Sequence, residues 1–114
     1  MKNTVAVHNQ LTEEIIATLN QLEDVYVWHN QTGAAFRGKR MIRFGCKGSA
    51  DIIGTVKGKF VALEVKTGTG RQKEDQKKFQ EVVEDAGGFY SIVRSREQAI
   101  DLVGVCSDLI GEAA

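Results

Sequence analysis

The chain has 114 residues and a formal net charge of +0, from 15 basic and 15 acidic side chains. That length corresponds to one domain, and a hydrophobic content of 42% can supply a modest core. No apolar run approaches the roughly 18 residues of a membrane span, and the N-terminus has no apolar stretch of the signal-peptide type, so we expect an intracellular protein without a membrane partner.

The net charge of zero conceals an uneven distribution along the chain. Residues 37–78 contain twelve basic and four acidic side chains, an excess of +8, whereas residues 1–36 carry −3 and residues 79–114 carry −5. A concentrated positive segment is typical of a surface that faces a polyanion such as nucleic acid. The alternative is a solvated surface on which the charges mix once the chain has folded.

Four segments can be assigned in the first part of the chain. A helix is predicted over residues 5–22, because apolar residues recur at helical spacing: Leu11, Ile15, Leu19 and Leu22. The β-branched and aromatic run Val25–Asn30 predicts a strand. Residues 31–40 have no hydrophobic period and contain two glycines, so we expect a mobile basic loop. A second short strand is expected over Met41–Phe44.

A β-hairpin is predicted at the centre of the chain. The apolar runs Asp51–Val56 and Lys59–Lys66 flank Lys57-Gly58, and a two-residue loop with Gly second fits a type I′ turn. In that register Asp51 faces Glu64, and alternation puts both carboxylates on one face together with Lys66. A three-residue loop would instead shift the register by one residue and separate the two carboxylates.

The last part of the chain predicts a helix, a strand and a helix. Gln72–Ala86 forms the first helix, and Gly87-Gly88 ends it. Its expected buried stripe is Phe79, Val82, Val83 and Ala86. Phe89–Val93 reads as a strand, and Ser95-x-x-Gln98 is a capping box that opens the last helix. The prediction is an α/β fold with a small mixed sheet, a central hairpin and flanking helices. Cys46 and Cys106 have no metal-type spacing and are expected to be reduced thiols.

The hairpin residues suit phosphodiester hydrolysis. Asp51 and Glu64 would supply carboxylates and Val65 a backbone carbonyl, oxygen ligands that suit Mg²⁺ or Mn²⁺. Lys66 could orient the attacking water and stabilise charge on the phosphate. Glu-x-Lys alone is a weak motif and by itself favours a solvated strand end. The Asp at hairpin-matched distance and the surrounding basic segment strengthen the metal-site hypothesis.

These segments resemble a known family. Arg43–Val103 is similar to the virus-type replication-repair nuclease (VRR-NUC) domain, a branch of the PD-(D/E)xK superfamily, over RFGCKGSADIIG, FVALEVKTGTGR, EDQKKF and AGGFYSIVRS. The resemblance implies one VRR-NUC-like domain over residues 1–114 with a restriction-endonuclease-like core. It implies a Mg²⁺- or Mn²⁺-dependent DNA endonuclease, selective for branched DNA like Holliday-junction resolvases and homodimeric. It places the protein in DNA repair, in the cytoplasm of a bacterial cell or a phage-infected host.

The family pattern carries over residue by residue. Asp51, Glu64 and Lys66 match its catalytic Asp, Glu and Lys, and Gln76 matches a glutamine on the following helix. Gln76 lies one turn before the buried stripe, so it points inward and could hydrogen-bond water or phosphate; the alternative is a polar residue at a fraying helix end. The family usually has Pro before the catalytic Asp, where this chain has Ala50, a change that removes no ligand.

The first helix of the family usually supplies a metal-linked Glu. Aligning the apolar pattern puts His8 at that position, and Glu14 is the nearest acidic alternative, although it lies off the helical face of His8. His8 could be a metal ligand or could pair with Asp51. A lone histidine on a helix surface is more often neither.

The basic segment supplies the expected DNA contacts. The candidates are Arg37, Lys39, Arg40, Arg43, Lys47, Arg71, Lys73 and Lys77. Trp28 and Phe36 are too sparse for a stacking platform and are expected in the core or at an interface. Two other functions compete with a nuclease: a non-catalytic DNA-binding module that retains the nuclease fold, and a small α/β domain whose basic loop contacts protein or RNA.

Overall fold

A computed structural model describes residues 4–31 and 33–113. Its helices and strands, in chain order, are α1 (Thr4–Leu19), β1 (Val25–His29), β2 (Gly33–Arg37), β3 (Arg40–Phe44), β4 (Ile52–Val56), β5 (Lys59–Val65), α2 (Glu74–Asp85), β6 (Phe89–Val93) and α3 (Arg96–Ala113). No helix within these ranges is long and apolar enough to cross a membrane.

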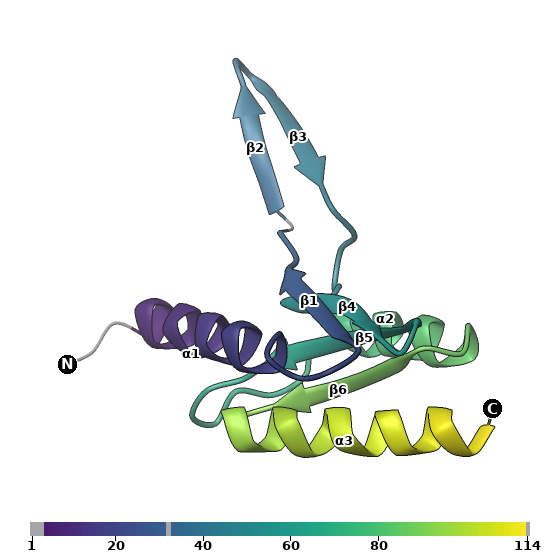
Figure 1. The fold of residues 1–114 in the computed structure, drawn as a ribbon. Coiled ribbons are helices and arrows are strands. Elements are labelled where there is room, and N and C mark those ends of the chain that lie inside the picture. Colours follow the sequence, from purple (N-terminus) through teal and green to yellow (C-terminus); the bar gives the residue numbers. More distant parts are fainter. Residues whose placement is uncertain (1–3, 32, 114) are drawn as a thin grey trace.

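The body of the protein is a mixed sheet with helices on both faces (Figure 1). The strand order is β1-β4-β5-β6; β1, β4 and β5 pair antiparallel, and β5 and β6 pair parallel with α2 as the crossover. Helices α1 and α3 cover one face, and α2 covers part of the other. The predicted α/β class and the central position of the hairpin are confirmed.

The register of the central hairpin is the predicted one. Lys57 and Gly58 both have positive φ, 49° and 81°, as a type I′ turn requires, and Ile52 pairs with Leu63. Alternate residues of β5 therefore face opposite layers. Val61, Leu63 and Val65 pack in the core beneath α1 and α3, whereas Ala62 packs in the smaller core beneath α2.

The first helix ends at Leu19, not at residue 22 as predicted. The side chain of Asn20 explains the early end. Its Oδ1 accepts a hydrogen bond from Val27 N at 2.8 Å, and its Nδ2 donates to Val27 O at 2.9 Å. This amide pairs with the backbone of β1 as another strand would, so the chain leaves the helix there.

The prediction of a loop over residues 31–40 is wrong. β2 pairs antiparallel with β3 around Gly38-Lys39, and Gly38 has a φ of 65° at the first loop position, as type II′ hairpins require. This two-stranded ribbon is separate from the main sheet. Neither face of the ribbon packs on a core within the described part of the chain, so its sequence has no reason to alternate between apolar and polar residues. Strand β2 therefore shows no hydrophobic period in the sequence.

Helix α2 begins at Glu74, two residues after the predicted start, and its buried stripe is narrower than expected. Val83 is buried, but Val82 is 66% exposed and Ala86 is exposed, because a helix on a narrow sheet meets it along one row of side chains. The helix ends in a Schellman motif: Gly88 N donates to Val83 O, Gly87 N donates to Glu84 O, and Gly87 has a φ of 94°.

The remaining predictions concern caps, thiols and aromatic residues. Ser95 Oγ accepts a hydrogen bond from Gln98 N, as the capping box predicts, although Gln98 Oε1 accepts from Arg94 N instead of completing the box at Ser95. Both cysteines are free thiols. Trp28 and Phe36 are 45% and 75% exposed, which excludes the core alternative and leaves the interface one.

Candidate active site

The candidate site forms where β4 begins and β5 ends. Asp51 lies immediately before β4, and its Oδ2 accepts a hydrogen bond from the Val65 N–H at 2.8 Å. This bond ties the carboxylate to the end of β5, one residue beyond Glu64. The predicted proximity of Asp51, Glu64 and Val65 is therefore present in the structure, because the type I′ turn sets the register that brings them together.

Glu64 is a buried carboxylate with an incomplete environment. The residue is 5% exposed, and in the described part of the chain its Oε2 has no hydrogen-bond partner. The pKa of Glu64 is raised from 4.5 to about 9, first by burial and then by the neighbouring Asp51 carboxylate, and the Lys66 ammonium opposes this rise. A buried carboxyl oxygen without a partner is costly for stability, so Glu64 is suited to receive a proton or a cation.

Lys66 is held beside this carboxylate by Gln76. The Lys66 Nζ donates to Gln76 Oε1 at 3.0 Å and lies 3.9 Å from Glu64 Oε1. Gln76 Oε1 also accepts the backbone N–H of Lys73, the N-cap residue of α2, at 2.8 Å. Gln76 therefore points inward, as the helical stripe predicts, and links the lysine to the first turn of α2.

His8 reaches the site from α1, whereas Glu14 does not. The His8 Nε2 lies 3.0 Å from Val65 O and 3.4 Å from Asp51 Oδ2, so it meets two of the groups predicted to hold a metal. Glu14 is exposed and accepts a hydrogen bond from Gln10 Nε2. Of the two first-helix candidates, only His8 is placed to pair with Asp51 or to contribute a ligand.

Asn30 is a residue of the site that the sequence analysis missed. Its N–H donates to Asp51 O at 2.7 Å, and its Nδ2 donates to Ser49 Oγ at 2.7 Å and to Ala50 O at 2.9 Å. These bonds hold the backbone before Asp51 against the end of β1. A polar residue after an aromatic strand was visible in the sequence, but its partners depend on which strand lies beside β1.

The donor set fits a hard divalent cation bound by few protein ligands. No three His, Cys, Asp or Glu side chains in the described ranges are grouped as a complete metal centre. The oxygens available are the carboxylates of Asp51 and Glu64 and the carbonyl of Val65. Mg²⁺ is commonly bound through one or two carboxylates, with waters completing its shell, and the unpartnered Glu64 Oε2 supplies a free ligand atom.

The predicted DNA-binding residues fall into two groups. Arg37, Lys39 and Arg40 are exposed at the tip of the β2–β3 hairpin, and Lys47, Arg71, Lys73 and Lys77 are exposed near the start of α2. The side chain of Arg43 lies outside the described part of the structure.

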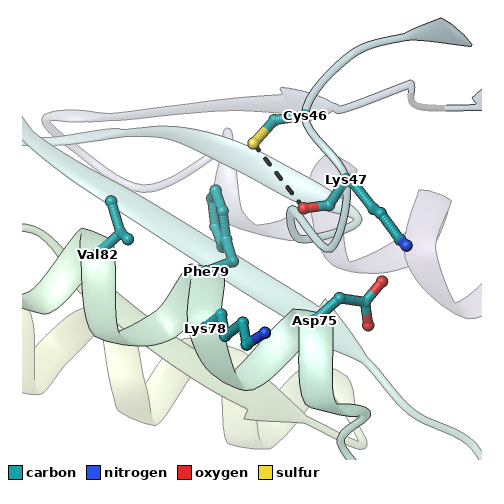
Figure 2. A pocket seen from close by; sticks show the side chains of 6 residues that line it. All are labelled: Cys46, Lys47, Asp75, Lys78, Phe79 and Val82. Atoms are coloured by element: carbon teal, nitrogen blue, oxygen red, sulfur yellow. Dashed lines mark hydrogen bonds between the residues drawn. The ribbon is translucent and has the colours of Figure 1, made fainter.

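A pocket of about 380 Å³ lies between α2 and the connector before Asp51. Figure 2 shows Phe79 and Val82 on α2 facing Cys46 and Lys47 on the connector, with Lys78 and Asp75 on the side of α2. The connector packs so closely on α2 at Gly48 that a Cβ there would overlap the backbone carbonyl of Asp75. Lys78, which was not among the predicted DNA contacts, adds another exposed basic side chain to those near the start of α2.

A comparison with models of known protein families finds no match, and a comparison with curated proteins finds no similar chain. The assignment of function therefore rests on the residues and their geometry.

Proposed function

We propose that this protein is a Mg²⁺- or Mn²⁺-dependent DNA endonuclease that hydrolyses phosphodiester bonds in branched DNA. We assign it a restriction-endonuclease-like core of the VRR-NUC type, as the resemblance of its motifs implies, and an action in DNA repair in the cytoplasm of a bacterial cell or a phage-infected host. The observation that carries the proposal is the buried Glu64 carboxylate, whose Oε2 has no partner in the described residues, beside Asp51 and Lys66.

The arrangement of charges supports a site that binds a cation and a phosphate. Two neighbouring carboxylates, one of them buried, destabilise a fold unless a proton or a cation joins them. Asp51, Glu64 and the Val65 carbonyl would hold the metal. When bound, a divalent cation polarises the phosphate and lowers the pKa of a water molecule, which makes hydrolysis accessible at neutral pH.

The side chains of the protein supply the rest of the mechanism. Lys66 is positioned by Gln76, and its ammonium can orient the attacking water and donate to a phosphate oxygen as negative charge develops there. The N-terminus of α2, with Lys73 at its cap, presents backbone N–H groups and a positive dipole that favour a phosphate. Asp51 is held in place by the Val65 N–H, so its carboxylate does not need to reorganise during the reaction.

A homodimer would match the substrate. A four-way junction presents two equivalent strands, and a twofold dimer presents two equivalent sites. We therefore include a homodimer in the proposal, with branched DNA as its partner.

The test is a cleavage assay on a labelled four-way junction, a flap and a linear duplex, with Mg²⁺, with Mn²⁺ and with EDTA. We expect metal-dependent cleavage of branched DNA and at least a roughly 100-fold loss of rate in Glu64→Ala, because the carboxylate is a metal ligand. Glu14→Ala is the matched control, because Glu14 is exposed and distant from these contacts. Thermal melting verifies that both variants fold.

Cleavage that survives EDTA or Glu64→Ala would overturn the mechanism. Tight binding of the junction without cleavage in either metal would instead identify a non-catalytic DNA-binding module.

A further inference from the structure

The β2–β3 hairpin stands away from the body of the protein. Figure 1 shows the two strands projecting from the sheet and joined to it through their two connectors. They pair with each other and with no other strand of the described chain, and the molecule measures 52 Å along its longest axis against 23 Å along its shortest. A ribbon whose described side chains are exposed contributes little to the core and is free to contact a partner.

The charge of the hairpin indicates the chemistry of its partner. The sequence contains no Asp or Glu from residue 25 to residue 50, and the exposed tip carries Arg37, Lys39 and Arg40. A purely basic ribbon repels a second copy of itself and is complementary to a polyanion. A two-stranded β-ribbon also has the dimensions to enter the major groove of DNA.

The hairpin also exposes a large apolar group directly behind this basic tip. Phe36 is 75% exposed, and it pairs across the ribbon with Met41, which is 47% exposed. The next pair toward the turn is Arg37 with Arg40. The Phe36 ring leaves apolar area in contact with water in the free protein, and such a ring suits contact with nucleic-acid bases.

The hairpin is connected to the candidate active site at its base. Both of its connectors meet at Asn30, which bonds to Ser49, Ala50 and Asp51 as described above. The hairpin is therefore anchored at the same short backbone segment that carries Asp51.

We propose that the β2–β3 hairpin recognises the branch point of the DNA substrate, and that Phe36 stacks on a base left unpaired or unstacked there. The inference rests on the proposed function and names the structural feature of the substrate that the site selects. Arg37, Lys39 and Arg40 bind the flanking phosphates, and the Phe36–Met41 pair supplies the apolar surface for the base. Within a linear duplex every base is paired and stacked on both sides, so the contact distinguishes a branch point from continuous duplex.

The experiment measures binding of the full-length protein in EDTA, so that no cleavage is needed. The probes are a four-way junction with 2-aminopurine at the branch point and a linear duplex of the same sequence. We expect Phe36→Ala to weaken junction binding by about ten-fold, to leave duplex binding unchanged and to abolish the change in 2-aminopurine fluorescence. Phe36→Trp should retain all three properties, because its ring also stacks.

The control is Val105→Ala, at an exposed apolar residue of α3 remote from the hairpin. Equal effects of Phe36→Ala on junction and duplex, or no effect on either, would overturn the inference. A change in the oligomeric state of Phe36→Ala, measured by light scattering, would also overturn the inference, because it would identify the hairpin as a contact between subunits. Because binding is measured without metal, a protein that never cleaves DNA but loses junction selectivity in Phe36→Ala would refute the proposed catalysis alone.

Discussion

Glu64 is the residue in which the requirements of folding and of chemistry conflict. Its carboxyl group is buried next to that of Asp51, and its pKa is raised to about 9, first by burial. At neutral pH the metal-free protein therefore holds a proton on Glu64 that the unfolded chain has released. A cation that binds Glu64 must displace that proton, which couples the site to pH.

The sign of the effect on stability follows from the direction of this shift. Between pH 4.5 and about 9 the folded state binds more protons at Glu64 than the unfolded state does, so the contribution of Glu64 to stability is lost as the pH rises. In EDTA we expect the free energy of unfolding to fall from pH 5 to pH 8, by at most about 1.4 kcal/mol per pH unit from this group.

Glu64→Gln should flatten this decline and be more stable than the natural protein at pH 8, because its amide cannot ionise. Urea denaturation at a series of pH values measures the difference, and Glu14→Gln, at an exposed residue, should follow the natural curve. Parallel curves for the natural protein and Glu64→Gln would contradict the raised pKa of Glu64.

The residues of the candidate site differ in how far the sequence could place them. Asp51, Glu64 and Lys66 are separated by one hairpin, so turn chemistry and strand alternation were enough to bring them to one face. The inward direction of Gln76 followed from the helical stripe and is confirmed by its bond to Lys66. The choice between His8 and Glu14 stayed open, because His8 meets Val65 across 57 residues of sequence.

At the scale of the elements, close contact between β1 and β4 depends on a glycine. A Cβ at Gly54 would overlap the carbonyl oxygen of Tyr26 and lie 2.6 Å from Val27 Cα. Both are backbone atoms, so no side chain can move aside to relieve the contact. Strand β1, which ends one residue before Asn30, can therefore approach β4 only because residue 54 has no side chain.

We expect Gly54→Ala to destabilise the protein by about 2–3 kcal/mol, because strand β1 must shift away from β4. The matched control is Gly104→Ala in α3, where a Cβ would meet no atom within 4 Å and where the better helix former should stabilise by about 0.5–1 kcal/mol. Thermal or urea denaturation measures both values. A Gly54→Ala protein as stable as the natural one would contradict this account of the β1–β4 contact.

At the scale of the whole molecule, the uneven charge of the sequence becomes an arrangement in space. Helices α1 and α3, which cover one face of the sheet, carry exposed acidic residues such as Glu13 and Asp101. The predicted DNA contacts whose side chains are described lie on the projecting hairpin and near the start of α2. DNA would approach the hairpin side and would be repelled from the α1–α3 side.

Salt dependence of DNA binding tests this arrangement. Each phosphate contact adds about 0.9 to the slope of log affinity against log salt concentration, so replacing Arg37, Lys39 and Arg40 together by Ala should lower the slope by about 2–3. Lys59→Ala is the control, because Lys59 is exposed at the end of β5 opposite to Glu64. A slope unchanged by the triple replacement would mean that the hairpin tip does not contact phosphates.

The sequence by itself determined the α/β class, the central hairpin with its register and the grouping of Asp51 with Glu64 and Lys66. Each of these depends on turn chemistry and periodicity over a few neighbouring residues, which are written locally in the chain. Only the tertiary structure decided that residues 33–44 form a projecting ribbon, that Asn30 holds the backbone before Asp51, and that His8 reaches the site. These features depend on which distant elements pack together, and a strand that packs on no core leaves no hydrophobic period by which to recognise it.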